Sequence, residues 1–254
     1  MIKNSSEKKK QISFELEDQK WFPEFLRAYQ TDLLGIIAKS LELYSPAKSF
    51  LKDKLRKGQT VADLASGSGV PTFLATNGME ISVKLSDKFP EGKQVEFMSK
   101  HDRIAYNPES VDVLRDDLPE GDCYTMFNGL HHFTPTEIAL ILRKAKSRNT
   151  PIYFFEPISP SLLVYLKVAL ATLILPIFLV PFIKPFRWDR LIFTYLIPIG
   201  ILATFWDGMI SVGKSYSISE IRRMEASIAP KEIFVSYGKL KGKFANLTYL
   251  GLEL

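Results

Sequence analysis

Short apolar segments alternate with segments of helical character along the first 156 residues, and this alternation constrains the fold more than any other feature. The apolar segments lie at 60–64, 81–85, 103–106, 124–127 and 151–155. Strands that alternate with helices at this spacing pair in parallel, and helices then cover both faces of the sheet. The sequence therefore predicts an α/β fold with a doubly wound sheet.

Helices are predicted before, between and after these strands in the sequence. Two precede the first strand, at 19–44, where apolar residues recur in steps of three and four, and at 46–56. Others are expected at 70–78, 135–146 and 219–227, and two more strands at 233–238 and 247–253. The short basic link GKLKGKFAN between the last two strands is typical of a hairpin, so we expect that pair to be antiparallel.

Composition sets broad limits on function. The 254 residues carry a net charge of +5, which permits contact with anionic lipid or nucleic acid without requiring it. Cys123 is the only cysteine, so an intramolecular disulfide is impossible and a reducing compartment is consistent. The first residues, MIKNSSEKKKQ, are polar and basic, and we interpret them as a solvated tail without a targeting signal.

A glycine-rich turn follows the first predicted strand. The strand contains Asp63, and the turn reads ASGSGVP at 65–71. The third glycine of the dinucleotide-binding fingerprint is missing, and the G-x-x-x-x-G-K-[ST] phosphate loop is absent. Asp87 follows the second strand, where a carboxylate can accept both ribose hydroxyls. The pattern favours a nucleoside without a pyrophosphate.

These residues together resemble the class I S-adenosylmethionine (SAM)-dependent methyltransferases. Their first motif, acid-x-Gly-x-Gly-x-Gly, is matched from Asp63 to Gly69, with Ala65 in place of the first glycine. Asp87 matches their ribose-binding acid, and LHHF at 130–133 is common after the fourth strand of members that act on small molecules. A bacterial subgroup with the strings DLxSGxGxP, LHHF, FEP and WDGxxS is especially similar. The resemblance covers roughly 58–156 and 215–254.

The resemblance implies a Rossmann-like seven-stranded sheet and a SAM site. Gly67 and Gly69 let backbone approach the donor, Asp63 meets its ammonium group directly or through water, and Asp112 accepts a hydrogen bond from adenine. The predicted SAM-binding residues are Asp63, Ala65, Ser66, Gly67, Gly69, Asp87, Asp112, Val113, Phe127 and Asn128. For Asp112 a plain solvated turn, and for Phe127 simple core packing, are open alternatives.

The adjacent pair His131 and His132 supplies the candidate base. Methyl transfer needs alignment of the reacting atoms, and a hydroxyl acceptor also benefits from a base whose pKa is near neutrality. We favour His132, with His131 close behind, and a structural role for both is the alternative. Glu156, at the end of the fifth strand, is expected to orient the acceptor or His132. Adjacent histidines rarely chelate one ion, so no metal site is predicted.

Residues 157–206 interrupt the alternation with a strongly apolar insert. Leu162–Ile183 contains 22 residues and one charge, Lys167, which is long enough to cross a bilayer. Because strands on both sides of the insert belong to one sheet, the chain must return to the side it left. The only return candidate, Leu191–Phe205, would span roughly 22 Å as a helix, short of the roughly 30 Å hydrocarbon core.

We therefore predict a hairpin that enters one leaflet through residues 160–206. Lys184, Arg187 and Arg190 would meet lipid headgroups and Trp188 would lie at the interface. A soluble apolar lid, which packs on the domain or dimerises, is the alternative. Tyr195, Trp206 and Asp207 are candidates to complete an acceptor pocket, with ordinary lid packing as the alternative.

The chain is thus predicted to have four parts: a tail with cap helices at 1–57, a SAM-binding core at 58–156, an apolar helical insert at 157–214 and the rest of the core at 215–254. The predicted function is methylation of a lipophilic small molecule, on oxygen and with a histidine base. The protein would be cytoplasmic, peripheral or monotopic at the inner face of the cytoplasmic membrane. The alternative is a non-catalytic, membrane-associated nucleoside-binding protein of the same fold. No basic-aromatic patch indicates nucleic acid.

Overall fold

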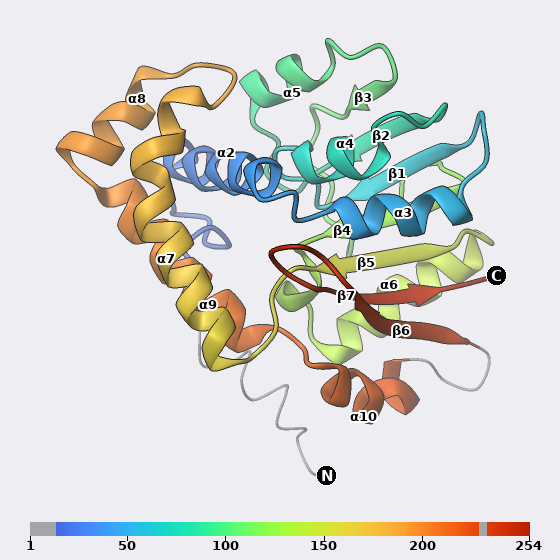
Figure 1. Cartoon of the computed structure of the whole chain (residues 1–254). Helices are drawn as coiled ribbons and strands as arrows, with labels where there is room; N and C mark the ends of the chain where they lie inside the picture. The colour runs from blue at the N-terminus through green and yellow to red at the C-terminus, as the bar shows by residue number, and fades with distance from the viewer. Residues whose placement is uncertain (1–13, 229–232) are drawn as a thin grey trace.

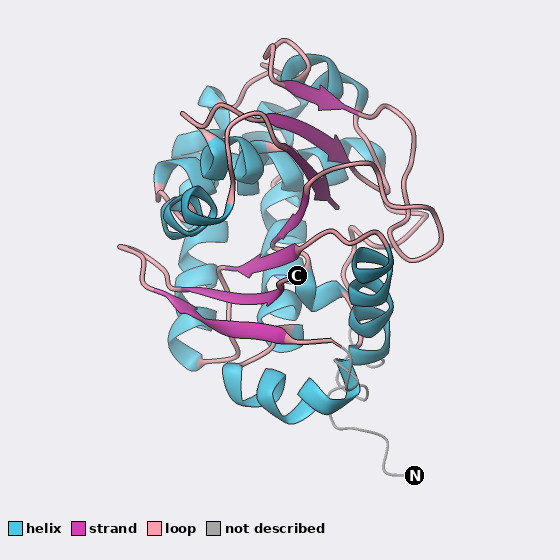
Figure 2. Cartoon of the chain, turned by 90° about the vertical axis from the view of Figure 1, so that its right-hand side faces the viewer, coloured by secondary structure: helices cyan, strands magenta, loops and turns pink. Residues whose placement is uncertain are grey.

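A computed structural model describes residues 14–228 and 233–254, so the predicted tail at 1–11 lies outside the described residues. Seven strands form one sheet in the order β3-β2-β1-β4-β5-β7-β6. Their bounds are β1 Thr60–Leu64, β2 Ser82–Ser86, β3 Ile104–Tyr106, β4 Cys123–Phe127, β5 Ile152–Glu156, β6 Val235–Leu240 and β7 Leu247–Leu252. The first five strands are parallel, and β7 lies antiparallel between β5 and β6 (Figure 2). The predicted sheet, including its antiparallel end, is confirmed.

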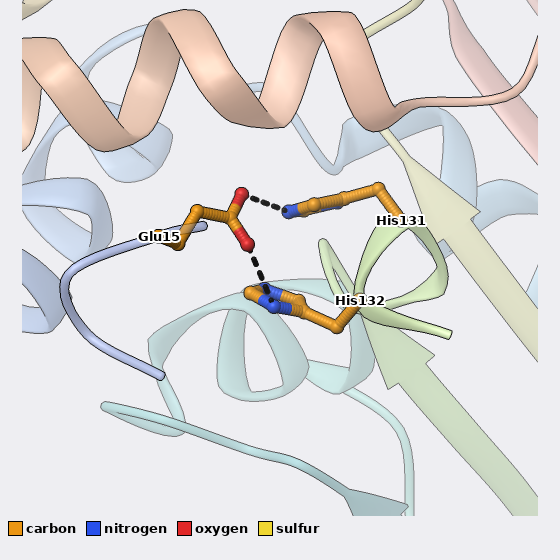
Figure 3. A group of neighbouring side chains, drawn as sticks. All are labelled: Glu15, His131 and His132. Atoms are coloured by element: carbon orange, nitrogen blue, oxygen red, sulfur yellow. Dashed lines mark ion pairs between the residues drawn. The ribbon is translucent and has the colours of Figure 1, made fainter. Parts of the chain in front are cut away.

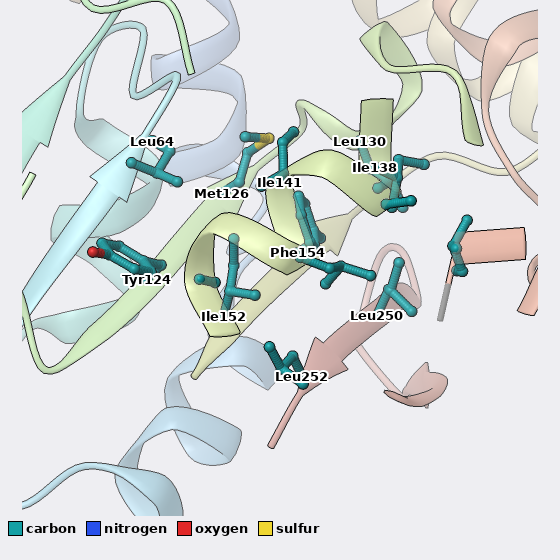
Figure 4. Close-up of a cluster of buried hydrophobic side chains, with 14 of the residues drawn as sticks. Leu64, Tyr124, Met126, Leu130, Ile138, Ile141, Ile152, Phe154, Leu250 and Leu252 are labelled. Atoms are coloured by element: carbon teal, nitrogen blue, oxygen red, sulfur yellow. The ribbon is translucent and has the colours of Figure 1, made fainter. Parts of the chain in front are cut away.

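Helices cover both faces of the sheet. One face is covered by α3 (Ser45–Lys54), α4 (Val70–Thr76) and α5 (Gly92–Met98), and the other by α6 (Pro135–Ser147) and α10 (Ile218–Ile228). Figure 4 shows the core on the second face, where Met126 and Phe154 of the central strands pack against Ile138 and Ile141 of α6. The central strands β4 and β5 are buried along their whole length, which explains their continuous apolar character.

The remaining helices lie beyond the carboxyl ends of the parallel strands. They are α2 (Glu24–Ser40) and the insert, which comprises α7 (Leu162–Leu179), η2 (Val180–Phe182), α8 (Trp188–Leu191), η3 (Ile192–Leu196) and α9 (Ile199–Lys214). The helices α2, α7 and α9 contact one another in a layer at this end of the molecule (Figure 1). The apolar insert therefore lies over the carboxyl edge of the sheet, where β1 ends and the glycine-rich turn begins.

Three elements differ from the sequence predictions. The helix expected at 19–44 is limited to α2, because Pro23 precedes its first turn and residues 41–44 form a turn with Glu42 at φ 48°. The short helix α5 was not predicted. The segment Leu191–Phe205 is not one helix: Trp188–Leu196 and Ile199–Lys214 meet at 81°, at the position of Pro198.

Candidate functional site

A crevice of about 390 Å³, here called the sheet-edge crevice, lies between the carboxyl ends of the strands and α2. The turn after β1 forms its floor, with Ala65, Gly67 and Gly69 at φ values of 53°, 52° and 70°. A Cβ atom at Gly67 would lie 2.8 Å from Cγ2 of Thr31. Glycine is therefore required at 67 both for its positive φ and for the close approach of α2.

Asp87 joins this turn to the end of β2. Its carboxylate accepts hydrogen bonds from the backbone N–H of Gly67 at 2.7 Å and of Phe89 at 2.8 Å. Burial raises the pKa of Asp87, while these two N–H groups act in the opposite direction. Asp87 lines the sheet-edge crevice, and its two oxygens retain lone pairs for further donors.

Asp63 lies beneath the crevice and does not line it. Its two carboxylate oxygens accept hydrogen bonds from the hydroxyls of Thr125 and Thr72, both at 2.6 Å, and the side chain is fully buried. Burial raises the pKa of Asp63 to about 7. The residue thus ties β1 to β4 and α4, which fixes the turn that follows it.

The other end of the crevice is formed by the segment after β3 and the end of β4. Asp112 pairs with Lys88 at 3.0 Å and accepts the N–H of Leu114; burial would raise its pKa, but Lys88 lowers it below the usual value. Val113, Phe127 and Asn128 also line the crevice, and Asn128 adopts φ 53°. Of the predicted SAM-binding set, only Asp63 and Gly69 are outside the lining.

The two histidines both face Glu15, as Figure 3 shows, but their other neighbours differ. His131 is buried, and its Nδ1 lies 2.9 Å from Glu156, which also accepts the N–H of Leu130. His132 lines the crevice, and its Nδ1 lies 3.0 Å from Glu15 and 3.1 Å from Asp18. Burial alone would lower the pKa of His132, but these two carboxylates raise it well above its usual value. The two carboxylates thus favour the protonated form of the imidazole.

Sequence reasoning missed the segment at 14–23, here called the N-terminal strap, which supplies Glu15, Glu17 and Asp18 to the site. Glu15 is fully buried between both histidines and Lys214, whose Nζ lies 2.7 Å away. Burial raises the pKa of Glu15, but His132 and the neighbouring cations lower it far below its usual range. The only sequence feature that could have indicated this segment is the acidic run ELED at 15–18, which follows the basic tail at 1–11.

The WDGxxS string holds the strap in place. Asp207 accepts the N–H groups of Leu16 at 2.6 Å and Glu17 at 3.1 Å, and Ser211, one turn further along α9, donates to Glu15 at 2.5 Å. The indole of Trp206 donates to the carbonyl of Phe14. The apolar insert therefore positions the acidic strap over the histidines. Tyr195 donates to the carbonyl of Ile177 within the insert.

The ligand atoms of Glu15, His131 and His132 lie within 4.8 Å of one another, a spacing that a metal ion could bridge. Lys214 already supplies a positive charge at Glu15, and the two oxygens of Glu156 are taken by the N–H of Leu130 and by Nδ1 of His131. We therefore describe the group as an ion-paired network.

A second cavity of about 360 Å³, here called the helix cavity, adjoins the crevice between α2, α7 and α9. The two cavities share four lining residues: Glu17, Leu34, Tyr44 and Asn128. The site thus consists of a polar crevice at the sheet and an apolar cavity under the insert, which meet at the strap.

No protein-family model matches the chain, and no curated protein matches its sequence. Among solved structures, the plantazolicin methyltransferase BpumL in complex with SAH is similar with a TM-score of 0.56 and 10% identity, over 91% of this chain and 95% of that chain. That likeness shows the fold, which is the class I fold of SAM-dependent methyltransferases.

Further neighbours of lower similarity include an O-methyltransferase family 2 protein from Planctomyces limnophilus in complex with apigenin (TM-score 0.46, 16% identity, 78% of this chain and 50% of that chain). Another is the human N-acetylserotonin methyltransferase in complex with SAM (TM-score 0.45, 13% identity, 75% and 46%). This chain matches only about half the length of these two proteins.

Proposed function

We propose that the protein transfers the methyl group of SAM to an oxygen atom of a lipophilic small molecule. The observation that carries the proposal is the sheet-edge crevice, in which Gly67, Asp87, Val113 and Asn128 meet within a methyltransferase fold. Its volume, about 390 Å³, lies in the range of small-molecule sites.

The charge of the crevice supports SAM over a dinucleotide. Seven lining residues are acidic, and only Arg27 and Lys88 are Arg or Lys. The acids are Glu17, Asp18, Asp32, Asp87, Glu91, Asp112 and Glu137. Three of these acids are neutralised by ion pairs, namely Asp32, Glu91 and Asp112. Asp87 and Glu137 remain against Arg27, so a sulfonium with an ammonium group is favoured over a pyrophosphate. The missing third glycine of the dinucleotide fingerprint agrees with this choice.

SAM supplies an activated methyl group when bound, and the chain's own residues would hold it. We assign Asp87 to the ribose hydroxyls, Asp112 and Val113 to the adenine, and Gly67 to the close approach of backbone. Asp63 would act through the turn that it fixes, since its oxygens are already bonded to two threonines.

We propose that the acceptor's proton leaves through the acid–histidine network around His132. His132 is the member of the predicted catalytic set that lines the crevice, while His131 and Glu156 lie behind it and position the loop after β4. Because Glu15 and Asp18 favour the imidazolium form, His132 would take part as a charged partner of a carboxylate, which replaces the simple histidine base expected from sequence.

The insert supports a location at a membrane. The bent pair Trp188–Leu196 and Ile199–Lys214 is apolar enough to cross a bilayer only if it is counted as one broken span. Among the described helices, the unbroken segment Leu162–Phe182 is long and apolar enough by itself, and 17% of its 18-residue apolar window is buried. Its exposed side chains include Leu162 at 77% and Phe178 at 65%. Large apolar side chains that lie together and exposed along one helix are unusual on a soluble monomer. We therefore propose monotopic binding at the cytoplasmic face of the membrane.

One experiment tests the function. The full-length protein is incubated with methyl-labelled SAM and a lipid-soluble cell extract, and labelled products are identified by mass spectrometry. A labelled methyl ether among the lipids supports the proposal. Binding of SAM without a labelled product would instead favour a non-catalytic nucleoside-binding protein.

A further inference from the structure

The helix cavity lies beneath the apolar insert and is a second candidate binding site. Its walls come from α2, α7 and α9, and the hairpin between β6 and β7 closes one end, where Lys167 donates to the carbonyl of Phe244. Apolar wall residues include Ile37, Leu41, Leu163, Val168 and Ala171. Leu163 is also 63% exposed, so the cavity borders the apolar outer face of the insert.

The other end of the helix cavity is polar and meets the sheet-edge crevice. Glu17, Tyr44 and Asn128 line both cavities, and Asp207 lines the apolar one. A molecule that fills the helix cavity therefore presents its last atoms at the crevice. Asp207, and Glu17 once it is deprotonated, disfavour a phosphate or carboxylate head at this end and favour a neutral hydroxyl.

Glu17 is the side chain at this junction that is free to accept a proton. Its carboxylate is 22% exposed and receives no hydrogen bond from any described residue, and its nearest charged partner is Nε2 of His132 at 3.8 Å. Burial raises the pKa of Glu17 to about 8; His132 opposes this effect, while Glu15, Asp207 and Asp18 add to it. A base of this strength suits a phenol, whose pKa is about 10, better than an aliphatic alcohol.

We propose that the helix cavity binds the methyl acceptor, a phenol with a hydrocarbon chain, and that Glu17 takes the proton of its hydroxyl. The proposal rests on the methyltransferase function proposed above. The chain of the acceptor lies between α2 and α7, and the phenol ring lies beside Tyr44 with its oxygen toward Asn128 and Glu17.

The transfer step is balanced. The phenol oxygen forms a bond to the methyl carbon of SAM while the carbon–sulfur bond breaks, and the electron pair of that bond stays on sulfur, which becomes neutral. The phenolic proton passes to the carboxylate of Glu17. His132, as an imidazolium 3.8 Å away, balances the negative charge of Glu17 before the proton arrives.

Two neighbouring positions on α7 provide a matched test of the cavity. Ala171 lines the helix cavity, whereas Leu170 is 59% exposed and does not. We expect the wild type to bind para-octylphenol at least about tenfold more tightly than para-cresol, because the longer chain buries more apolar surface. Ala171→Trp should remove this preference and Leu170→Trp should keep it. Calorimetry with the two phenols and with SAM, plus thermal melting, is the readout.

A transfer assay with methyl-labelled SAM and para-octylphenol tests Glu17. Glu17→Gln should keep the affinity for SAM and for the phenol but lower the turnover at least about a hundredfold, whereas exposed Glu24→Gln should not. Equal binding of both phenols, unchanged binding by Ala171→Trp, binding without transfer in the wild type, or full turnover of Glu17→Gln would each overturn the inference. If the wild type does not bind SAM, the proposed function itself fails.

Discussion

At the scale of single residues, the turn after β1 contains a non-glycine residue in a glycine conformation. Ala65, which replaces the first glycine of the methyltransferase motif, adopts φ 53°. This left-handed conformation costs an L-residue about 1–2 kcal/mol. The strain lies in the floor of the sheet-edge crevice, and the rest of the fold offsets it.

Ala65→Gly should therefore stabilise the protein. Relief of the strain exceeds the added flexibility of the unfolded chain, which costs about 0.4–1 kcal/mol, so we expect a gain of about 0.5–1 kcal/mol in the free energy of unfolding by urea denaturation. Ala62→Gly, in the buried middle of β1, is the control and should destabilise. A loss of stability in Ala65→Gly would contradict the assignment of strain.

If Glu17 is the base, as we propose, its raised pKa should make the reaction depend on pH. Glu17 must be deprotonated to accept a proton, and its pKa is about 8. Because deprotonation increases as the pH rises, kcat/KM should rise with pH and level off above about pH 8. A pH–rate profile with para-octylphenol would show this limb in the wild type. The residual activity of Glu17→Gln should not show this rise of kcat/KM with pH. An identical profile in both proteins would mean that another group causes the rise.

At the scale of elements, two basic residues of the insert are not where the sequence prediction placed them. The prediction that Arg187 and Arg190 meet lipid headgroups is wrong. Arg190 is buried and pairs with Asp32 of α2, and Arg187, only 9% exposed, pairs with Glu91 and Asp189. These residues fasten α8 to the domain, while Lys184 and Trp188 remain exposed.

Membrane binding by this insert should consequently depend little on lipid charge. Each basic residue near an anionic surface contributes about 1 kcal/mol, and under our proposal the apolar face of α7 would supply most of the attraction. We expect flotation with neutral phosphatidylcholine vesicles to be within about threefold of that with vesicles containing anionic lipid. Leu166→Glu combined with Leu173→Glu should abolish both. Binding to anionic vesicles alone would point to an electrostatic interface.

Sequence patterns predicted the strands more accurately than the helices. Strand β1 has the predicted bounds because it is a nearly continuous apolar run, interrupted by Asp63, between a turn and the glycine-rich segment. The helix α5 buries only Gln94 and Met98, so no apolar face identifies it. The bend before α9 depends on how the insert packs on α2, which local sequence does not determine, although Pro198 marks the place.

At the scale of the whole molecule, the site is assembled from parts far apart in the sequence. The crevice residues follow the strand ends, and the predicted parallel sheet was sufficient to place most of them at one edge. The strap is different, because Glu15 and Glu17 reach the site through contacts with Asp207 and Ser211, about 190 residues later. A contact between residues so far apart cannot be predicted from a local sequence pattern, and the polar start of the chain resembles a solvated tail.

The four-part division of the chain also acquires a functional interpretation. We propose that the core at 58–156 and 215–254 binds the donor, while the insert and the cap at its N-terminal side form the acceptor cavity between them. The two cavities meet at the strap, so membrane contact, acceptor binding and the proton-accepting group depend on the same layer of helices.

Calorimetric titration of the full-length protein with SAM and SAH tests the central claim, that the sheet-edge crevice binds a methyl donor. Asp87 lines the crevice and Asp117 is fully exposed, so Asp87→Ala and Asp117→Ala form a matched pair. We predict that the wild type and Asp117→Ala bind both ligands, and that Asp87→Ala loses at least about tenfold in affinity with the loss of its hydrogen bonds to ribose. No binding by the wild type, or equal affinity in all three proteins, would contradict the account.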